Sequence, residues 1–159
     1  MNTATAKMVI ETYTDKTYRS KLKVYTVLFN PEGYTLDWGF SFKEESFVTG
    51  GSRTLMEGVN RSVFDMKFII DGTGVGAAAL GRSSVNVADE IWNFMETATA
   101  LNRKGTRKPE PPFCRLVWGN LCAKCLVSKV KLDVTLLDRK GAPLRATLTT
   151  TFQTIYPEK

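Results

Sequence analysis

Apolar and polar residues alternate along several stretches of the chain, a pattern typical of β-strands that bury one face. The alternation is clear at residues 64–70, 129–137 and 144–152. The last two runs flank Asp138-Arg139-Lys140-Gly141, in which glycine can adopt the left-handed conformation that a tight turn needs. A C-terminal β-hairpin is therefore predicted.

The N-terminal half predicts two more strands. Residues 22–29 include apolar residues at both odd and even positions, which indicates a strand buried on both faces. The strand ends at the turn Asn30-Pro31-Glu32-Gly33. A half-buried strand should follow, because apolar and polar positions alternate there. Its apolar positions are Leu36, Trp38, Phe40 and Phe42.

The periodicity lapses between Glu44 and Asn60, and Thr49-Gly50-Gly51-Ser52-Arg53 has the most flexible composition in the chain. A loop of this length in a compact domain is either functional or ordered only on binding. Residues 44–60 are therefore predicted to form a long functional loop.

One helix is predicted, with Asn86 as its N-cap and Asp89 and Glu90 in its first turn. Its apolar face is made of Val87, Ile91, Phe94, Met95, Ala98 and Leu101. A short strand should follow at residues 113–118. About six strands and one helix predict a mainly β (α+β) fold, an antiparallel β-barrel or sandwich with one flanking helix.

Length and composition narrow the function. The 159 residues fit a single domain over residues 1–159, with residues 1–20 a candidate flexible N-terminal segment. The chain has no histidine, so the commonest general base and metal ligand is missing, and neither an enzyme nor a metal site is expected. No signal peptide or membrane span is predicted, and three cysteines make no disulfide framework.

Two short motifs invite a chemical interpretation. Gly72-x-Gly74-x-x-Ala77 fits the tolerant dinucleotide fingerprint, but the predicted helix begins only at Asn86 and the preceding strand is antiparallel in character, so a flexible corner is favoured and no cofactor is expected. Cys122-Ala123-Lys124-Cys125 has the spacing of half a zinc site. Residues three apart on a strand point to opposite faces, so the two sulfurs should not meet.

The formal net charge of +6 permits binding to nucleic acid, and Arg103, Lys104, Arg107 and Lys108 form the densest basic cluster. A solvated basic surface is the simpler interpretation, because the basic residues are otherwise spread along the chain. A small basic nucleic-acid-binding β-barrel stays as an alternative, although no specific nucleic acid is indicated.

Four motifs in order resemble the tube-protein domain of contractile injection systems, over about residues 20–156. They are Phe29-Asn30-Pro31-Glu32, Phe68-Ile69-Ile70-Asp71-Gly72-Thr73-Gly74, Pro111-Pro112 leading to Val117-Trp118-Gly119, and Gly141-x-Pro143-x-Arg145-Ala146. The resemblance implies an Hcp-like barrel of two packed sheets with a flanking helix, assembled as a hexameric ring. It also implies a protein of the bacterial cytoplasm that assembles into a phage-tail-like particle, with release from the cell left open.

The resemblance is to the branch of tube initiators, baseplate adaptors that join a trimeric spike to the inner tube. An ordinary tube layer is the alternative within the same machine. Many members carry a C-terminal LysM domain. None is expected in these 159 residues, so a separate LysM protein joins the spike, the baseplate and the adjacent tube layer as a candidate partner. The candidate inter-subunit arm consists of Val48, Thr49, Gly50, Gly51, Ser52, Arg53 and Thr54.

Overall fold

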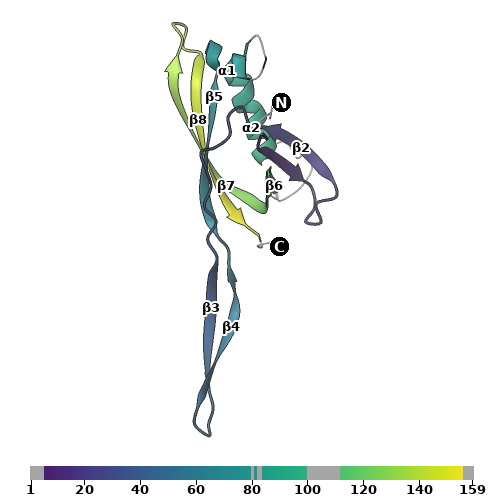
Figure 1. The fold of residues 1–159 in the computed structure, drawn as a ribbon, viewed down its shortest axis with the longest axis vertical. Coiled ribbons are helices and arrows are strands. Elements are labelled where there is room, and N and C mark those ends of the chain that lie inside the picture. Colours follow the sequence, from purple (N-terminus) through teal and green to yellow (C-terminus); the bar gives the residue numbers. More distant parts are fainter. Residues whose placement is uncertain (1–5, 80, 82–83, 100–111, 156–159) are drawn as a thin grey trace, which may run out of the picture.

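The computed structural model describes residues 6–79, 81, 84–99 and 112–155. These residues form a six-stranded antiparallel sheet in the order β2-β1-β6-β7-β8-β5, a separate two-stranded sheet β3-β4, and two helices (Figure 1). The strands are β1 (Val9–Tyr13), β2 (Lys21–Thr26), β3 (Gly39–Ser46), β4 (Ser52–Asn60), β5 (Val63–Asp71), β6 (Phe113–Trp118), β7 (Leu121–Leu137) and β8 (Pro143–Thr154), and the helices are α1 (Gly74–Ala79) and α2 (Val87–Thr99).

Strand β7 connects the two halves of the large sheet. It is 17 residues long, and its first part pairs with β6 while its later part pairs with β8. The sheet bends along this strand, so β1, β2 and β6 lie opposite β5 and β8 (Figure 1). The fold is mainly β with antiparallel pairing, as predicted, but the described strands do not close into a barrel.

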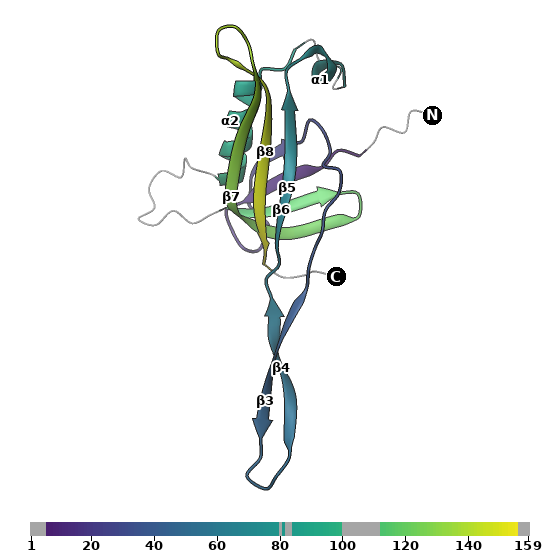
Figure 2. The ribbon, with the colours of Figure 1, turned by 90° about the vertical axis from the view of Figure 1, so that its left-hand side faces the viewer.

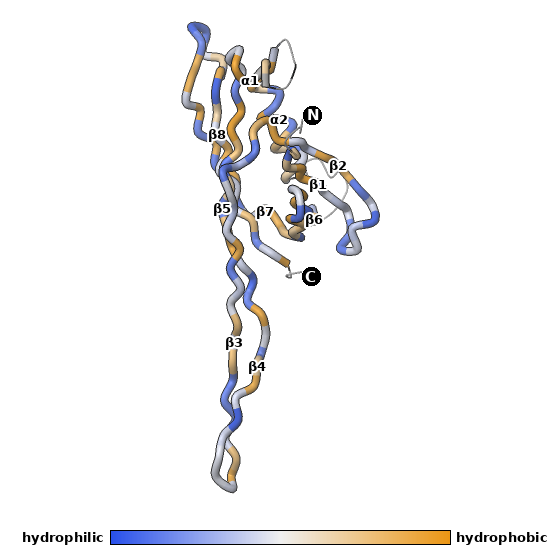
Figure 3. Tube along the Cα trace, viewed as in Figure 1, coloured by the Kyte–Doolittle hydropathy of each residue, from blue (hydrophilic) through white to orange (hydrophobic). Residues whose placement is uncertain are grey.

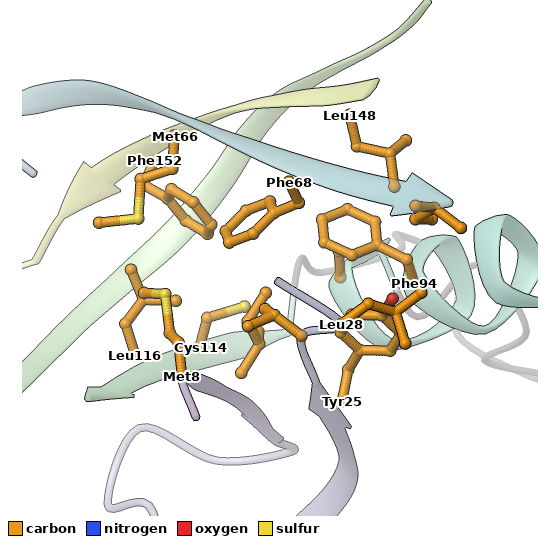
Figure 4. Close-up of a cluster of buried hydrophobic side chains, with 14 of the residues drawn as sticks. Met8, Tyr25, Leu28, Met66, Phe68, Phe94, Cys114, Leu116, Leu148 and Phe152 are labelled. Atoms are coloured by element: carbon orange, nitrogen blue, oxygen red, sulfur yellow. The ribbon is translucent and has the colours of Figure 1, made fainter. Parts of the chain in front are cut away.

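The core fills the space inside the bent sheet, and Phe94 of α2 points into it from the helix side (Figure 4). The Phe94 ring centroid lies 5.3 Å from that of Tyr25 and 5.4 Å from that of Phe68. Tyr25 and Phe68 belong to opposite halves of the sheet, and Phe68 in turn meets Phe152 edge-on at 6.3 Å. Phe94 therefore packs the two halves together, in ring geometries that aromatic pairs favour.

Several sequence predictions are confirmed. Helix α2 begins after Asn86, whose side-chain oxygen accepts a hydrogen bond from the Asp89 amide at 3.2 Å. Strand β5 buries the alternate positions from Phe64 to Ile70, β6 occupies residues 113–118, and Gly141 has a φ of +83° in the β7–β8 turn. Leu101 of the predicted helix face and the Arg103, Lys104, Arg107 and Lys108 cluster lie outside the described residues.

Other predictions are corrected. Residues 9–13, within the candidate flexible N-terminal segment, form β1, where Ile10 and Tyr13 are buried. Strand β2 is an edge strand in which Lys21 to Val24 are exposed, so it is not buried on both faces. The buried residues of this region are Tyr25 in β2 and Val27 and Leu28 just after it. A second helix, α1, begins at Gly74, and β7 begins at Leu121, earlier than the alternation indicated.

Gly72 is required by the close packing of the chain around it. Strand β5 pairs antiparallel with β8, and the Gly72 amide donates a hydrogen bond to the Leu144 carbonyl at 2.9 Å. A Cβ at this position would lie 2.7 Å from Val87 Cγ2 and 2.9 Å from the Val85 carbonyl oxygen. The absence of a side chain therefore lets the start of α2 lie directly on the end of β5.

We expect Gly72→Ala to destabilise the fold by about 1–3 kcal/mol, because backbone at Val85 must move to admit the methyl group. Thermal unfolding followed by circular dichroism would show this as a drop of several degrees in Tm. Gly74→Ala is the matched control, because nothing lies within 4 Å of its added Cβ. Equal Tm values for the two variants would contradict the packing argument.

A charged cluster ties β1 to its neighbours. The Glu11 carboxylate accepts hydrogen bonds from Arg115 Nη2 at 2.6 Å, Lys21 Nζ at 2.8 Å and the Tyr13 hydroxyl at 2.7 Å. Burial alone would raise the pKa of Glu11, but the hydrogen bonds from Lys21, Tyr13 and Arg115 outweigh it and lower the pKa to about 2. The ionised form of Glu11 therefore stabilises the folded state.

A carboxyl group whose pKa is lowered by folding stabilises the protein above its unfolded pKa, and this stabilisation disappears as pH falls through the folded value. For Glu11 that window runs from pH 4.5 down to about 2. We expect Glu11→Gln to lower the free energy of unfolding at pH 7 by about 1–3 kcal/mol, with the deficit shrinking across this window. Urea titrations at pH 7, 4 and 2.5 would measure it, with exposed Glu57→Gln as control; a deficit independent of pH would contradict the assignment.

Candidate assembly interface

The β3–β4 hairpin projects away from the rest of the molecule (Figures 1 and 2). Its strands pair in register from Gly39 opposite Asn60 to Ser46 opposite Ser52, with a bulge after Ser41. Residues 44–60, predicted as a loop, therefore form most of a β-hairpin. Charged residues interrupt the alternation of apolar and polar positions from Glu44 onward, so periodicity does not reveal this hairpin.

One face of the hairpin is apolar and uncovered. Phe40 lies opposite Val59 and Phe42 opposite Met56, and paired residues share a face. The Phe42 side chain is 63 % exposed and Met56 is 55 % exposed. We call these four residues the hairpin face. Figure 3 shows apolar positions along both projecting strands, whereas an isolated two-stranded ribbon has no core to cover them.

Phe40, Phe42 and the preceding Trp38 were expected to lie in a half-buried strand, and all three are exposed by more than half. The alternation correctly predicted the strand at residues 39–43. Periodicity shows which side chains share a face, but it does not show what covers that face. The functional residues that sequence reasoning missed are therefore the aromatic positions that it had placed in the core.

The opposite face of the hairpin is polar. The Arg53 guanidinium contacts the Glu45 carboxylate at 3.1 Å, and Lys43 lies on the same side, opposite Leu55. Both partners of the ion pair are well exposed, so solvent screening limits its contribution to stability. The base of the hairpin is therefore amphipathic, with Phe40 and Phe42 on one face, whereas toward the tip Glu44 follows on the same side as these two rings.

The tip of the hairpin is a tight turn. The Phe47 amide donates to the Gly51 carbonyl at 2.9 Å, the Gly50 amide donates to the Phe47 carbonyl at 3.1 Å, and both glycines have positive φ. Of the candidate arm residues, Val48, Thr49, Gly50 and Gly51 form the turn, and Ser52, Arg53 and Thr54 begin β4. Val48 is fully exposed.

Three strands of the large sheet keep an unpaired edge among the described residues: β2, β5 and the part of β7 beyond Cys125. Strand β5 pairs with β8 alone, and β7 beyond Cys125 pairs with β8 alone. Two open depressions lie beside the edge of β5, of about 550 Å³ and 560 Å³, and both are lined by Glu32, Gly33 and Asp65. Exposed strand edges are templates for pairing with another chain.

The cysteines lie on both sides of one sheet. Cys122 is exposed and Cys125 is buried, so their side chains point to opposite faces, as predicted. Cys125 instead lies opposite Cys114 of β6, and burial raises the pKa of the Cys114 thiol to about 12. These thiols are therefore protonated at neutral pH. Within the described part of the chain, His, Cys, Asp and Glu form no group of three that could hold a metal ion.

The motifs that resemble tube proteins meet in pairs. Asn30 Nδ2 and Trp118 Nε1 both donate to the Ala6 carbonyl, at 2.8 Å and 3.1 Å. The Asp71 carboxylate accepts hydrogen bonds from the Thr73 amide at 2.7 Å and from Arg145 Nη2 at 2.8 Å. Burial would raise the pKa of Asp71, but the bonds from Thr73 and Arg145 lower it. Each pair therefore fixes one end of the sheet.

The described helices include none long and apolar enough to cross a membrane. A comparison with curated proteins found no match. The family model of the contractile injection system tube protein matches residues 4–159, almost the whole chain. A tube subunit must contact copies of itself, which accords with an exposed apolar hairpin and unpaired strand edges. The chain belongs to the contractile injection system tube protein family, whose members are structural subunits of the tube.

Proposed function

We propose that this protein is the inner-tube initiator of a contractile injection system, an adaptor that joins the spike to the first ring of a hexameric tube. The observation that carries its assembly role is the projecting hairpin, whose phenylalanine and methionine side chains face water in the single chain. Monomeric proteins rarely expose a contiguous apolar surface of this kind. The four ordered motifs support a tube-type subunit, and an ordinary tube layer of the same machine stays as the alternative role.

In this proposal the copies form an Hcp-like ring, and each copy contributes its bent sheet to the wall of that ring. The unpaired edges of β5 and β7 support it, because pairing between copies would satisfy backbone groups that a single chain leaves open. The hairpin acts as the arm that reaches a neighbouring copy. The protein works as a structural component, without an enzymatic step or a cofactor, and the structural role of the family supports this.

The candidate partners follow from the same role. They are copies of the chain in the ring, the adjacent tube layer, the trimeric spike and the baseplate, with a separate LysM protein as a further candidate. The particle would assemble in the bacterial cytoplasm. An initiator differs from an ordinary tube subunit in where its assembly stops: it forms one layer on the spike, whereas a tube subunit stacks into long tubes.

Negative-stain images of the purified protein, alone and with its spike, would test the initiator assignment. We expect single rings seated on the spike, with elongation only after the main tube subunit is added. Long tubes formed by this protein alone would show an ordinary tube layer instead. A monomer that stays solitary beside the spike and the tube subunit would contradict both assignments.

Deletion of residues 48–54 removes the turn and the start of β4, and we expect it to leave a folded body that no longer forms rings. The reason is that the body has its own core around Phe94, whereas the arm makes no contribution to that core. Light scattering would measure the particle mass and circular dichroism would verify the fold. Rings of normal size from the deleted chain would refute the role of the arm.

A further inference from the structure

We propose that the hairpin face docks on the exposed aliphatic end of β7 in a second copy of the chain. We call that end the β7 strip; it consists of Leu132, Val134, Leu136 and Leu137, all exposed. The inference rests on the proposed function, because it identifies the surface that receives the arm. The proposed function identifies the hairpin as the donor of the contact, and this inference adds the surface that accepts it.

Leu132 and Val134 of the β7 strip lie on a core face that lacks its cover, whereas Leu136, opposite Arg145 after a register shift, points to the other face. Leu132 pairs with Leu148 and Val134 with Ala146, and both β8 partners are fully buried. Leu132 and Val134 are nevertheless 45 % and 42 % exposed. The difference arises because, within the described residues, no strand pairs with this part of β7 on the side away from β8. An added strand on that side would extend the sheet and cover Leu132 and Val134.

The hairpin has the shape and chemistry of such a strand. Its two strands pair only with each other, so each keeps a free outer edge among the described residues. Its apolar and polar faces lie on opposite sides, like those of β7, where Leu132 alternates with Lys131 and Asp133. A hairpin paired to β7 can therefore place Phe40 and Phe42 beside the strip while its charged face joins the solvated face of the sheet.

Donor and acceptor lie at opposite ends of the same molecule. The hairpin forms one end of the long axis, and the β7–β8 turn lies at the other end in both views (Figures 1 and 2). The hairpin of one chain consequently cannot reach its own β7 strip, so the acceptor belongs to another copy. Contacts between two different surfaces of one chain are heterologous and can repeat from copy to copy, which suits a ring or a stack.

The available apolar area suits a repeated contact. Large side chains that are about half exposed each offer roughly 100 Å², so the four residues of the hairpin face and the four of the β7 strip together offer about 800 Å². Stable interfaces bury about 1,200–2,000 Å² in total, and polar surface beside the strands would supply the remainder. Each copy uses one donor and one acceptor, so closure of a ring adds avidity.

The depressions beside β5 are a poorer acceptor. Their walls carry Asn30, Glu32, Asp65 and Lys67, and an apolar hairpin face would leave these groups without water. The β7 strip offers aliphatic side chains instead. The charged walls suit a polar segment, so the unpaired edges of β5 and β7 differ in the partner they can take.

Four variants test the proposal in the full chain. Phe42→Ser with Met56→Ser removes the donor, and Leu132→Ser with Val134→Ser removes the acceptor. The matched controls are Lys43→Ser and Lys131→Ser, which lie on the opposite faces of the same strands. All the altered residues are exposed, so circular dichroism should show a native fold. We expect both double variants to lose rings in light scattering and both controls to form them.

Mixing the two defective chains gives a sharper test. Each keeps the surface that the other lacks, so one intact interface should form and the mixture should yield a one-to-one dimer but no ring. A second measurement uses Phe42→Cys in one chain and Leu132→Cys in another, each with Cys122→Ser to remove the exposed thiol. Mild oxidation should then give a cross-linked dimer only when both cysteines are present.

The outcomes separate this inference from the proposed function. Normal rings from the acceptor variant, together with loss of rings from the donor variant, would overturn the β7 strip as acceptor and leave the arm intact. The absence of the mixed cross-link in wild-type-sized rings would do the same. A wild-type chain that remains monomeric alone, with its spike and with the tube subunit would instead overturn the proposed function, and this inference with it.

Discussion

A ribbon of two β-strands has two faces and no third layer, so it cannot bury an apolar face by itself. This constraint governs the β3–β4 hairpin, in which Phe40 and Phe42 lie beside Val59 and Met56 in solvent. The hairpin stands away from the body, and the body fills its own core without it. Within the described part of the chain nothing covers the apolar side chains of the hairpin, so contact with another molecule would bury them.

The body is built so that the hairpin can project. Strand β7 belongs to both halves of the large sheet, and the Phe94 ring packs between Tyr25 and Phe68 on the inside of the bend. The hairpin continues into β5, which is held by β8 along its whole length. A rigid base under a solvent-exposed arm keeps the arm aimed in one direction, and this lowers the entropy lost when it docks.

The unpaired edges of the large sheet are the second feature that suits contact with another chain. The later part of β7 and the outer side of β5 both offer unpaired backbone within the described residues. They differ in chemistry, because aliphatic side chains flank β7 whereas charged groups flank β5. Two edges with different surroundings favour a directional contact between unlike surfaces, the kind that rings and tubes of one subunit require.

Local patterns in the sequence were sufficient for the elements that one stretch of chain specifies. The alternation of β5, the Asn86 cap of α2 and the glycine turn at Gly141 all follow from neighbouring residues. The four ordered motifs also predicted the family correctly, because each motif is a short run of neighbouring residues that the sequence shows directly. The flexible corner predicted at Gly72 is instead a tightly packed position followed by α1, and the contact with Val87 explains the glycine.

Tertiary structure decided what the alternating faces touch. Phe42 and Phe68 occupy equivalent positions in alternating patterns, yet Phe68 is buried and Phe42 is 63 % exposed. The difference comes from strand order, because β5 is covered by the rest of the bent sheet and β3 pairs only with β4. Burial depends on residues far away along the chain, so periodicity within one segment predicts a face but not its cover. The candidate interface is made of faces that the described residues of this chain do not cover.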